Sequence, residues 1–273
     1  MKRLPTAPVL PGETLASKYK VERILGSGGM GIVVAARHLE LDERVAIKFL
    51  LRSSDDATVL SRFLREARAA AKAKSEHVCR VFDVGRLDTG EPYLVMEYLE
   101  GVDLRDHLDA SGPLSIEEVS SLMIEACLGL SEAHALGIVH RDLKPANVFL
   151  TTRANGTTCV KLLDFGISKL PSSDAMTSTS ALIGSPAYMS PEQIVSARTV
   201  DGRADIWSIG IMLHELVSGK PPFDADSVLQ LSVKIREEEA PPLPDHVKNP
   251  AFDAVIRKCL AKDPDDRYPD VAS

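Results

Sequence analysis

The sequence has few cysteines and no cysteine pair of the kind that holds a metal or a structural disulfide. It contains four, Cys79, Cys127, Cys159 and Cys259, and they are far apart with no C-x-x-C spacing. Isolated cysteines are typical of proteins in a reducing compartment. Their spacing also excludes a zinc site that could be recognised from the sequence.

Long hydrophobic runs and an excess of basic residues are also missing. No apolar run approaches the roughly 20 residues of a membrane-spanning helix, and the first segment, MKRLPTAPVLPGETL, lacks a signal-peptide core. With 32 Lys and Arg against 39 Asp and Glu, the net charge is −7, which argues against nucleic-acid binding. We expect a cytoplasmic segment without membrane contact of its own, either free or as the cytosolic domain of a longer, membrane-anchored chain.

What is present is an ordinary globular composition, with 44% hydrophobic and 26% charged residues in a chain of 273. That length supports one sizeable core or two modest ones. The first half carries short β-rich runs bounded by turn residues, which predict an antiparallel sheet of five strands. These runs are residues 19–26, 31–39, 44–51, 78–87 and 92–99.

Helical periodicity appears once among these strands and dominates after residue 103. Residues 55–76 place apolar side chains at helical spacing and cations on the other side, which predicts one long amphipathic helix. A β-interlude near residues 147–166 reads as a hairpin turned at Asn155 and Gly156. The chain is therefore predicted to be an α+β protein. Further helices are expected within residues 116–137, 203–219, 227–239 and 252–263.

The glycine-rich stretch LGSGGMGIVV, residues 25–34, has three interpretations: a dinucleotide site, a lid over ATP, or a plain hairpin turn. A dinucleotide site needs a helix after the glycines and an acidic residue about 20 positions on. Here a β-branched run follows, and Lys48 stands at that distance. The dinucleotide interpretation therefore loses both supports, and a flap of backbone N–H groups over phosphates fits better.

Two later segments concentrate chemically useful side chains. VHRDLKPANVFL, residues 139–150, brings together Asp142, which can accept a proton, Lys144, which can neutralise phosphate, and Asn147, whose oxygen can bind a metal. In LLDFGISK, Asp164 ends a predicted hairpin strand, where a carboxylate can be held against Mg²⁺.

Together these motifs resemble those of the eukaryotic-like protein kinase family, in the bacterial serine/threonine style. The resemblance covers nearly the whole chain in the family's order: G-x-G-x-x-G-x-V at 26–33, V-A-I-K at 45–48, H-R-D-L-x-x-x-N at 140–147, D-F-G at 164–166, S-P-E at 190–192 and DIWSIG at 205–210. It implies one kinase domain over residues 1–273, with an N-terminal extension (1–18), an N-lobe (19–98) and a mainly helical C-lobe (99–273) truncated before its last helices.

The resemblance also implies roles for the charged residues. Lys48 would hold the α- and β-phosphates of ATP and pair with Glu66 of the long helix, although a mere surface charge is the alternative at Glu66. Asp142 would orient or accept the proton of the substrate hydroxyl, and Lys144 would steady the γ-phosphate.

The metal and the nucleotide would be held by further residues. Asn147 and Asp164 would bind Mg²⁺, or Mn²⁺ in its place. The glycine-rich lid implied by the resemblance consists of Leu25, Gly26, Ser27, Gly28, Gly29, Met30, Gly31, Ile32 and Val33. The adenine and ribose would meet Ala46, Met96, Phe149, the backbone of Glu97 and Leu99, and Asp103.

Substrate class and regulation follow from neighbouring positions. Lys144 resembles serine/threonine rather than tyrosine kinases, and Ser185 stands where the family mostly has threonine. Arg141 is a cation next to the catalytic aspartate, and Thr177 and Thr179 are placed like the loop phosphosites of bacterial kinases. Flexible loop residues without this role are the alternative. We expect protein substrates, loop autophosphorylation and a homodimer that supports it.

Two other functions compete with an active kinase. A nucleotide-binding pseudokinase scaffold is disfavoured because Lys48, Asp142 and Asp164 are all present. A small-molecule phosphotransferase of aminoglycoside type is disfavoured because GSPAYMSPE, residues 184–192, resembles a platform for protein substrates.

Overall fold

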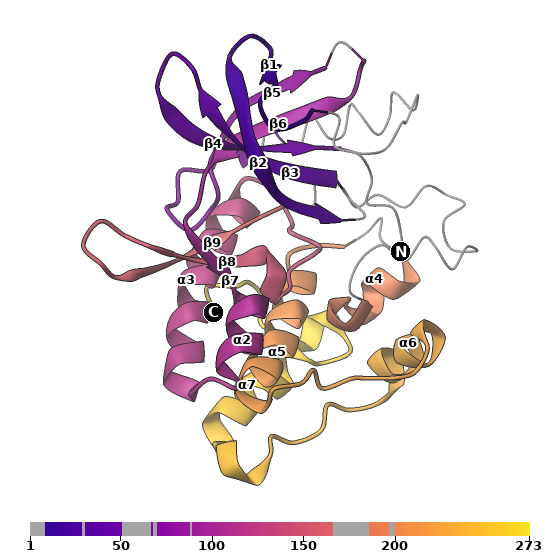
Figure 1. Ribbon diagram of the computed structural model, residues 1–273. Helices are drawn as coiled ribbons and strands as arrows, with labels where there is room; N and C mark the ends of the chain where they lie inside the picture. The colour runs from indigo at the N-terminus through magenta and orange to yellow at the C-terminus, as the bar shows by residue number, and fades with distance from the viewer. Residues whose placement is uncertain are drawn as a thin grey trace. The chain divides into compact units, whose positions relative to one another are not determined.

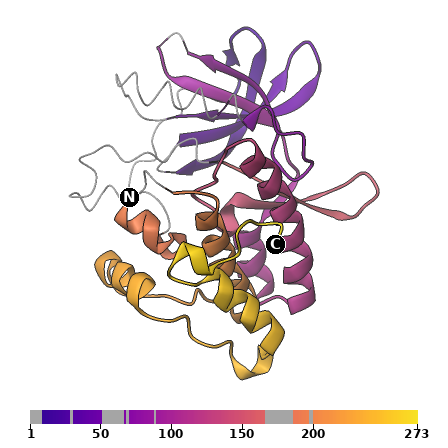
Figure 2. The ribbon, with the colours of Figure 1, turned by 180° about the vertical axis from the view of Figure 1, so that it is seen from behind.

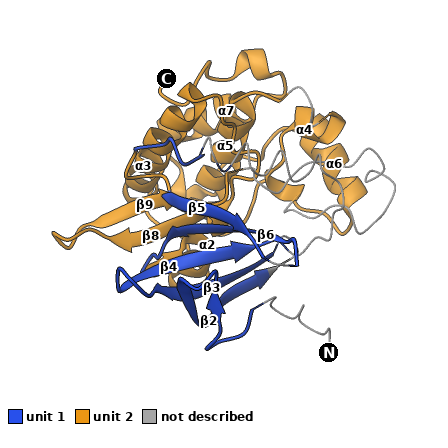
Figure 3. Ribbon diagram, turned by 90° about the horizontal axis from the view of Figure 1, so that it is seen from above, with its two compact units in different colours: residues 1–74, 79–100 blue, residues 75–78, 101–273 orange. Residues whose placement is uncertain are grey.

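A computed structural model describes residues 9–28, 31–50, 67, 70–87, 89–165, 186–196 and 200–273. The chain divides into two compact units, coloured separately in Figure 3. Unit 1 consists of Met1–Lys74 and Cys79–Glu100, and unit 2 of Ser75–Val78 and Gly101–Ser273. The chain therefore enters unit 2 briefly, for four residues, before returning to unit 1.

In its described part, unit 1 is an antiparallel sheet in the order β1-β2-β3-β4-β6-β5 (Figure 1). The five predicted strands are all present, and a sixth, β1, adds to the edge. A strand of two residues is too short to show the period-2 pattern by which strands are recognised, which is why the sequence did not indicate it. The strands are β1 Thr14–Leu15, β2 Tyr19–Gly28, β3 Gly31–His38, β4 Glu43–Phe49, β5 Val81–Arg86 and β6 Pro92–Glu97.

The sheet buries a compact core on one face. Side chains alternate across a strand, so one face of β3, β4 and β6 carries the large apolar residues. Val9 and Leu15, from the segment expected to be an N-terminal extension, are buried in the same cluster. Its members are Val9, Leu15, Tyr19, Val21, Ile32, Val34, Ala36, Val45, Ile47, Phe49, Tyr93 and Val95.

The register places the predicted nucleotide residues on the opposite face. Val33 pairs with Lys48, and Ala46 pairs with Met96. Paired residues of antiparallel strands share a face, so these four side chains lie together. Of the predicted helix over residues 55–76, residues 55–66, 68 and 69 lie outside the described part of the chain. Ala67 and Ala70 are helical and buried. The predicted end of the helix is wrong, because residues 71–76 form a turn and a loop.

Unit 2 is mainly helical, with a small antiparallel sheet in the order β7-β8-β9. The predicted hairpin is confirmed, with its turn at Asn155 and Gly156, and its tip projects away from the helices (Figure 2). The strands are β7 Gly101–Asp103, β8 Val148–Thr152 and β9 Thr158–Leu162. The helices are α2 Leu104–Ser111, α3 Ile116–Ala135, α4 Pro191–Val195, α5 Arg203–Ser218, α6 Val228–Glu237 and α7 Pro250–Cys259.

The helix α5 is the centre of unit 2 and packs against α3 and α7 (Figure 1). Every residue from Ala204 to Val217 is buried, as expected of a helix that is predominantly apolar around its circumference. No helix in the described part of the chain has both the length and the apolar character needed to cross a membrane.

Polar side chains on α5 are buried with partners from other elements. Glu215 is 2% exposed and accepts hydrogen bonds from Arg105 on α2, at 2.5 Å, and from the Tyr188 hydroxyl, at 2.6 Å. Arg105 also donates to the Tyr188 oxygen at 2.7 Å. Because each buried polar group finds a partner, the three side chains join α2, α5 and the turn at Pro186–Tyr188.

Because two histidines are buried, we expect acid to lower the free energy of unfolding. Burial lowers the pKa of His140 and of His214, so the unfolded chain, with an imidazole pKa of about 6.5, binds protons more readily. The free energy of unfolding should therefore fall as the pH drops below about 6.5 toward the folded-state pKa values. Urea denaturation at about pH 7.5 and about pH 5.5 tests this. His214→Gln should reduce the difference, and equal stability at both pH values would contradict it.

The buried Glu215 predicts a large cost on truncation. Glu215→Ala leaves Arg105 and Tyr188 without their acceptor, which should lower the free energy of unfolding by about 3–5 kcal/mol. Asp109, an exposed partner of Arg105 at 3.6 Å, is the matched control, and Asp109→Ala should change stability by less than about 1 kcal/mol. Chemical denaturation measures both, and similar costs for the two variants would be inconsistent with the buried network.

Candidate functional site

The loop between α3 and β8 holds the candidate catalytic residues, and Asp205 of α5 fixes its start. Asp205 is completely buried. One of its oxygens, Oδ2, accepts from the backbone N of His140 at 2.8 Å and lies 2.7 Å from the His134 Nε2. The other, Oδ1, accepts from the backbone N of Arg141 at 2.9 Å. One carboxylate thus positions two consecutive backbone groups.

His140 is held as a neutral imidazole. Its Nε2 donates to the Leu163 carbonyl at 2.8 Å, which leaves Nδ1 to accept from the Asp142 backbone N at 3.3 Å. One donor and one acceptor describe the neutral ring, and burial lowers the pKa of His140. The ring also packs on Phe165, with centroids 4.8 Å apart. His140 therefore connects the loop to the segment after β9.

Asp142, Lys144 and Asn147 come together within this loop. The Lys144 Nζ lies 3.1 Å from the Asp142 Oδ2. The Asn147 Nδ2 donates to the Asp142 carbonyl at 2.7 Å and reaches its Oδ2 at 3.4 Å. Both hydrogen bonds use the Asn147 nitrogen, so these contacts within the described residues leave its side-chain oxygen for a ligand.

Asp164 is brought beside Asn147 by the backbone. The Leu163 N donates to the Asn147 carbonyl at 2.9 Å, and Asp164 follows with a left-handed φ of 56°. Arg141 has a similar φ of 62°. Left-handed conformations are costly for non-glycine residues and concentrate at functional sites.

The donor set around Asn147 and Asp164 suits a hard divalent cation. Carboxylate and amide oxygens are the ligands that Mg²⁺ and Mn²⁺ accept. The hydrogen bonds of the Asn147 side chain described above use its nitrogen, and Asp164 directly follows Leu163, whose N–H is bound by the Asn147 carbonyl. The residues present therefore fit a magnesium or manganese ion.

In unit 1, glycine is needed at two positions of the candidate lid for different structural reasons. A Cβ on Gly31 would lie 2.1 Å from the Phe49 carbonyl oxygen, so close packing of β3 on β4 requires this glycine. A Cβ on Gly26 would meet no atom of the described residues within 4 Å. Packing against the described residues therefore leaves Gly26 unexplained, and the open space beside it fits a lid whose backbone approaches a ligand. Leu25, Ser27, Gly28, Ile32 and Val33 lie on the same hairpin, formed by β2 and β3.

Some of the residues predicted to contact the adenine and ribose belong to unit 1, and others belong to unit 2. Lys48 and Ala46 are buried on β4. Asp103 caps α2, where its Oδ1 accepts from the backbone N of Arg105 and of Asp106, each at 2.9 Å.

Three further residues complete this predicted set. The Glu97 N donates to the Arg80 carbonyl at 3.0 Å, so that N–H is already engaged. Phe149 pairs with Asp103 between β8 and β7, and Leu99 is half-buried. Several predicted residues lie outside the described part of the chain: Gly29, Met30, Glu66, Thr177, Thr179 and Ser185.

Two observations around the loop extend what the sequence indicated. Glu192, of the S-P-E triplet, forms an ion pair with Arg267, with N–O distances of 2.8 and 2.9 Å. Burial opposes ionisation of Glu192, but Arg267 outweighs it, so the pKa of this carboxyl is lowered.

The Arg141 Nε is buried, and no acceptor for it lies within the described residues. This is consistent with a cation that meets an anion from elsewhere.

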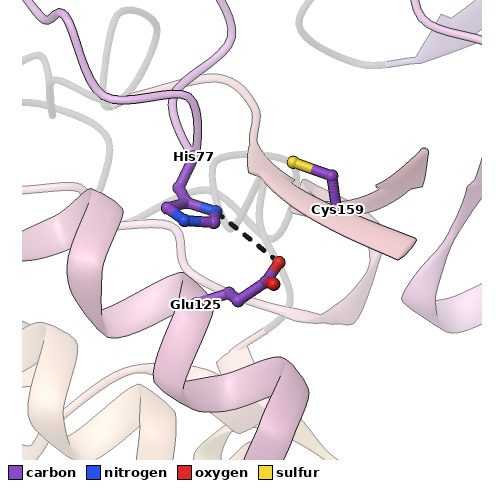
Figure 4. A group of neighbouring side chains, drawn as sticks. All are labelled: His77, Glu125 and Cys159. Carbon is purple, nitrogen blue, oxygen red and sulfur yellow. Dashed lines mark ion pairs between the residues drawn. The ribbon is translucent and has the colours of Figure 1, made fainter. Parts of the chain in front are cut away.

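A second polar cluster joins the segment Ser75–Val78 to α3 and β9 (Figure 4). It contains His77, Glu125 and Cys159, the ligand types of a transition metal. The His77 Nδ1 lies 3.0 Å from the Val160 carbonyl and 3.6 Å from the Glu125 Oε2. Glu125 also accepts from Arg153 at 3.0 Å. Because this guanidinium already compensates the carboxylate, we interpret the cluster as a structural tether.

Comparisons with known proteins agree with this arrangement. Residues 19–270 match the family model described as the protein kinase domain. The chain is 39% identical to serine/threonine-protein kinase pkn3 of Myxococcus xanthus, over 97% of this chain and 50% of the relative. It is also 39% identical to serine/threonine-protein kinase PknB of Mycolicibacterium smegmatis, over 93% of this chain and 41% of the relative.

A solved structure shares the fold. The crystal structure of the Mycobacterium tuberculosis PknI kinase domain superposes with a TM-score of 0.73 at 31% identity, covering 96% of this chain and 95% of that one. The chain spans half or less of the length of the curated relatives named above. On the match to the kinase family model and these relatives, the chain belongs to the protein kinase family, in its bacterial serine/threonine branch.

Proposed function

We propose that this chain transfers the γ-phosphate of ATP to serine and threonine hydroxyls of proteins. The observation that carries the proposal is the group Asp142, Lys144 and Asn147, held in one loop beside Asp164 by Asp205 and His140. Catalysis of phosphoryl transfer is largely positioning and charge neutralisation. A buried loop held at both ends suits that task.

Each residue of the loop has a distinct part in the proposal. Asp142 orients the substrate hydroxyl and accepts its proton at a carboxylate oxygen. Lys144, 3.1 Å from that carboxylate, neutralises charge on the transferring phosphoryl group. Because Lys144 follows Asp142 by two positions, as in serine/threonine kinases, we infer that aliphatic hydroxyls rather than tyrosine are the substrates.

The nucleotide would be bound by groups of unit 1, and the metal by groups of unit 2. In unit 1, Lys48 binds the phosphates of ATP, while Val33, Ala46 and Met96 offer the adenine an apolar surface on one face of the sheet. In unit 2, Asn147 and Asp164 hold Mg²⁺ or Mn²⁺. The bound cation supplies positive charge to the phosphate oxygens.

Regulation is proposed to act through Arg141. Its position next to Asp142 and its buried Nε suit a charge-assisted bond to a phosphate. We infer that Thr177 or Thr179 is autophosphorylated between two copies of the chain on the cytosolic side of the cell. An inactive nucleotide-binding scaffold is disfavoured, because Lys48, Asp142 and Asp164 are all retained.

Replacing the proton acceptor should abolish most of the activity. The assay measures transfer of labelled phosphate from ATP, with Mg²⁺, to a generic protein that bears serine and threonine. Asp142→Asn should lower kcat by at least about a hundred-fold, and Lys48→Met should cause a comparable loss. Asp109→Asn, on the exposed side of α2, is the control and should retain activity.

Thermal unfolding of each variant checks that the fold is intact. Equal incorporation of phosphate by the wild-type protein, Asp142→Asn and Lys48→Met would overturn the catalytic assignment. Transfer to an aminoglycoside but not to protein would instead identify a small-molecule phosphotransferase.

Removing the proposed loop phosphosites should reduce activity toward a second substrate. In Thr177→Ala/Thr179→Ala, the loss of a charge-assisted bond to Arg141 should lower the rate by roughly tenfold. Mass spectrometry should also show loss of phosphate from residues 172–185. Thr152→Ala, at an exposed position of β8, is the matched control. Unchanged activity of the double variant would refute the switch.

A further inference from the structure

Gln193 lies in the first turn of α4, where both ends of its amide are used. Its Oε1 accepts from the backbone N of Ser190 at 2.9 Å and from the Ser190 hydroxyl at 3.3 Å. This is the arrangement of a capping box, in which the third helical residue reaches back to the residue before the helix. The amide oxygen is therefore committed to α4, and the nitrogen points to another acceptor.

That acceptor is the backbone carbonyl of Arg141. The Gln193 Nε2 donates to it at 3.0 Å, while the Arg141 N–H is held by the Asp205 Oδ1 at 2.9 Å. Both polar backbone groups of this residue are thus bound by side chains, one from α4 and one from α5. Arg141 is also in the left-handed region, with a φ of 62°.

These contacts bear directly on Asp142. A left-handed non-glycine residue persists only where its surroundings over-determine it. The carbonyl of Arg141 belongs to the peptide that leads into Asp142, so the direction of this carbonyl sets where the Asp142 side chain begins. The N–H of the same peptide, that of Asp142, donates to the His140 Nδ1 at 3.3 Å, so Gln193 adds the hold on its carbonyl side.

We propose that Gln193 is a positioning residue, which locks the Arg141–Asp142 peptide and thereby aims the Asp142 carboxylate. The proposal rests on the function proposed above, in which Asp142 accepts the hydroxyl proton. It also links α4 to the catalytic loop. A displacement at Ser190 would be passed by one amide group to the residue before Asp142.

Gln193→Glu tests the two hydrogen-bonding groups of the amide separately. Glutamate keeps an oxygen for Ser190 and is itself a favoured residue of the capping box, so α4 and the fold should be retained. It removes the N–H donor and places a carboxylate against the Arg141 carbonyl. We expect kcat to fall roughly ten- to a hundred-fold, with the KM for ATP little changed. Gln193→Met, which removes both ends, should show the same fall.

Gln230→Glu is the matched control, because it makes the same exchange at the third residue of α6, where the side chain is exposed. It should leave kcat within about twofold. Hydrogen exchange supplies a readout that does not need activity. The amides of residues 138–147 should exchange faster in Gln193→Glu than in the wild-type protein, and at the wild-type rate in Gln230→Glu.

The exchange measurement decides the proposal even if the wild-type protein transfers no phosphate, a result that would instead refute the proposed function. Unchanged exchange across residues 138–147 in Gln193→Glu overturns the positioning role. So does a kcat equal to that of an active wild-type protein. Faster exchange with a lower kcat in Gln193→Glu, and neither change in Gln230→Glu, supports it.

Discussion

The geometry of unit 2 depends on one buried carboxylate. Asp205 is removed from water on a helix that is itself buried, and an ionised carboxylate in such a place needs donors. It finds them in the backbone N–H groups of His140 and Arg141, together with the His134 ring. The burial of Asp205 is tolerated only while the loop presents those groups, so the helix and the loop conformation stabilise each other.

That constraint extends from the loop to the neighbouring segments through the hydrogen bonds of His140 and Asn147. The neutral ring of His140 joins Asp142 to Leu163, and Asn147 joins the same loop to Leu163 from the other side. The oxygens of Asp142, Asn147 and Asp164 are therefore carried by backbone that is already held. Such preorganisation is where electrostatic catalysis gains most, because little reorganisation is left for the reaction itself.

The sequence indicated the elements better than the contacts between them. Periodicity predicted the five long strands of unit 1 and four helices of unit 2, because each is long enough to repeat. The elements β1, β7 and α4 are too short to show a period. The contact between Gln193 and Arg141 joins residues 52 apart in the sequence, so no local pattern reveals it, although the Ser190–Gln193 spacing is visible as a capping box. Residues such as Lys48 and Asp142 were found because their motifs are local.

Arg141 and Asp164 show why strain is kept where glycine would remove it. Both adopt a left-handed φ, 62° and 56°, which glycine accepts at almost no cost. Glycine at Asp164 would delete the carboxylate, and glycine at Arg141 would delete the cation beside Asp142. Each position needs both its side chain and its left-handed backbone. The conformational strain is therefore offset by neighbouring groups, which for Arg141 are Asp205 on its N–H and Gln193 on its carbonyl. The hydrogen bonds around the loop thus hold its left-handed residues in place, and the left-handed conformations direct the backbone groups that make those bonds.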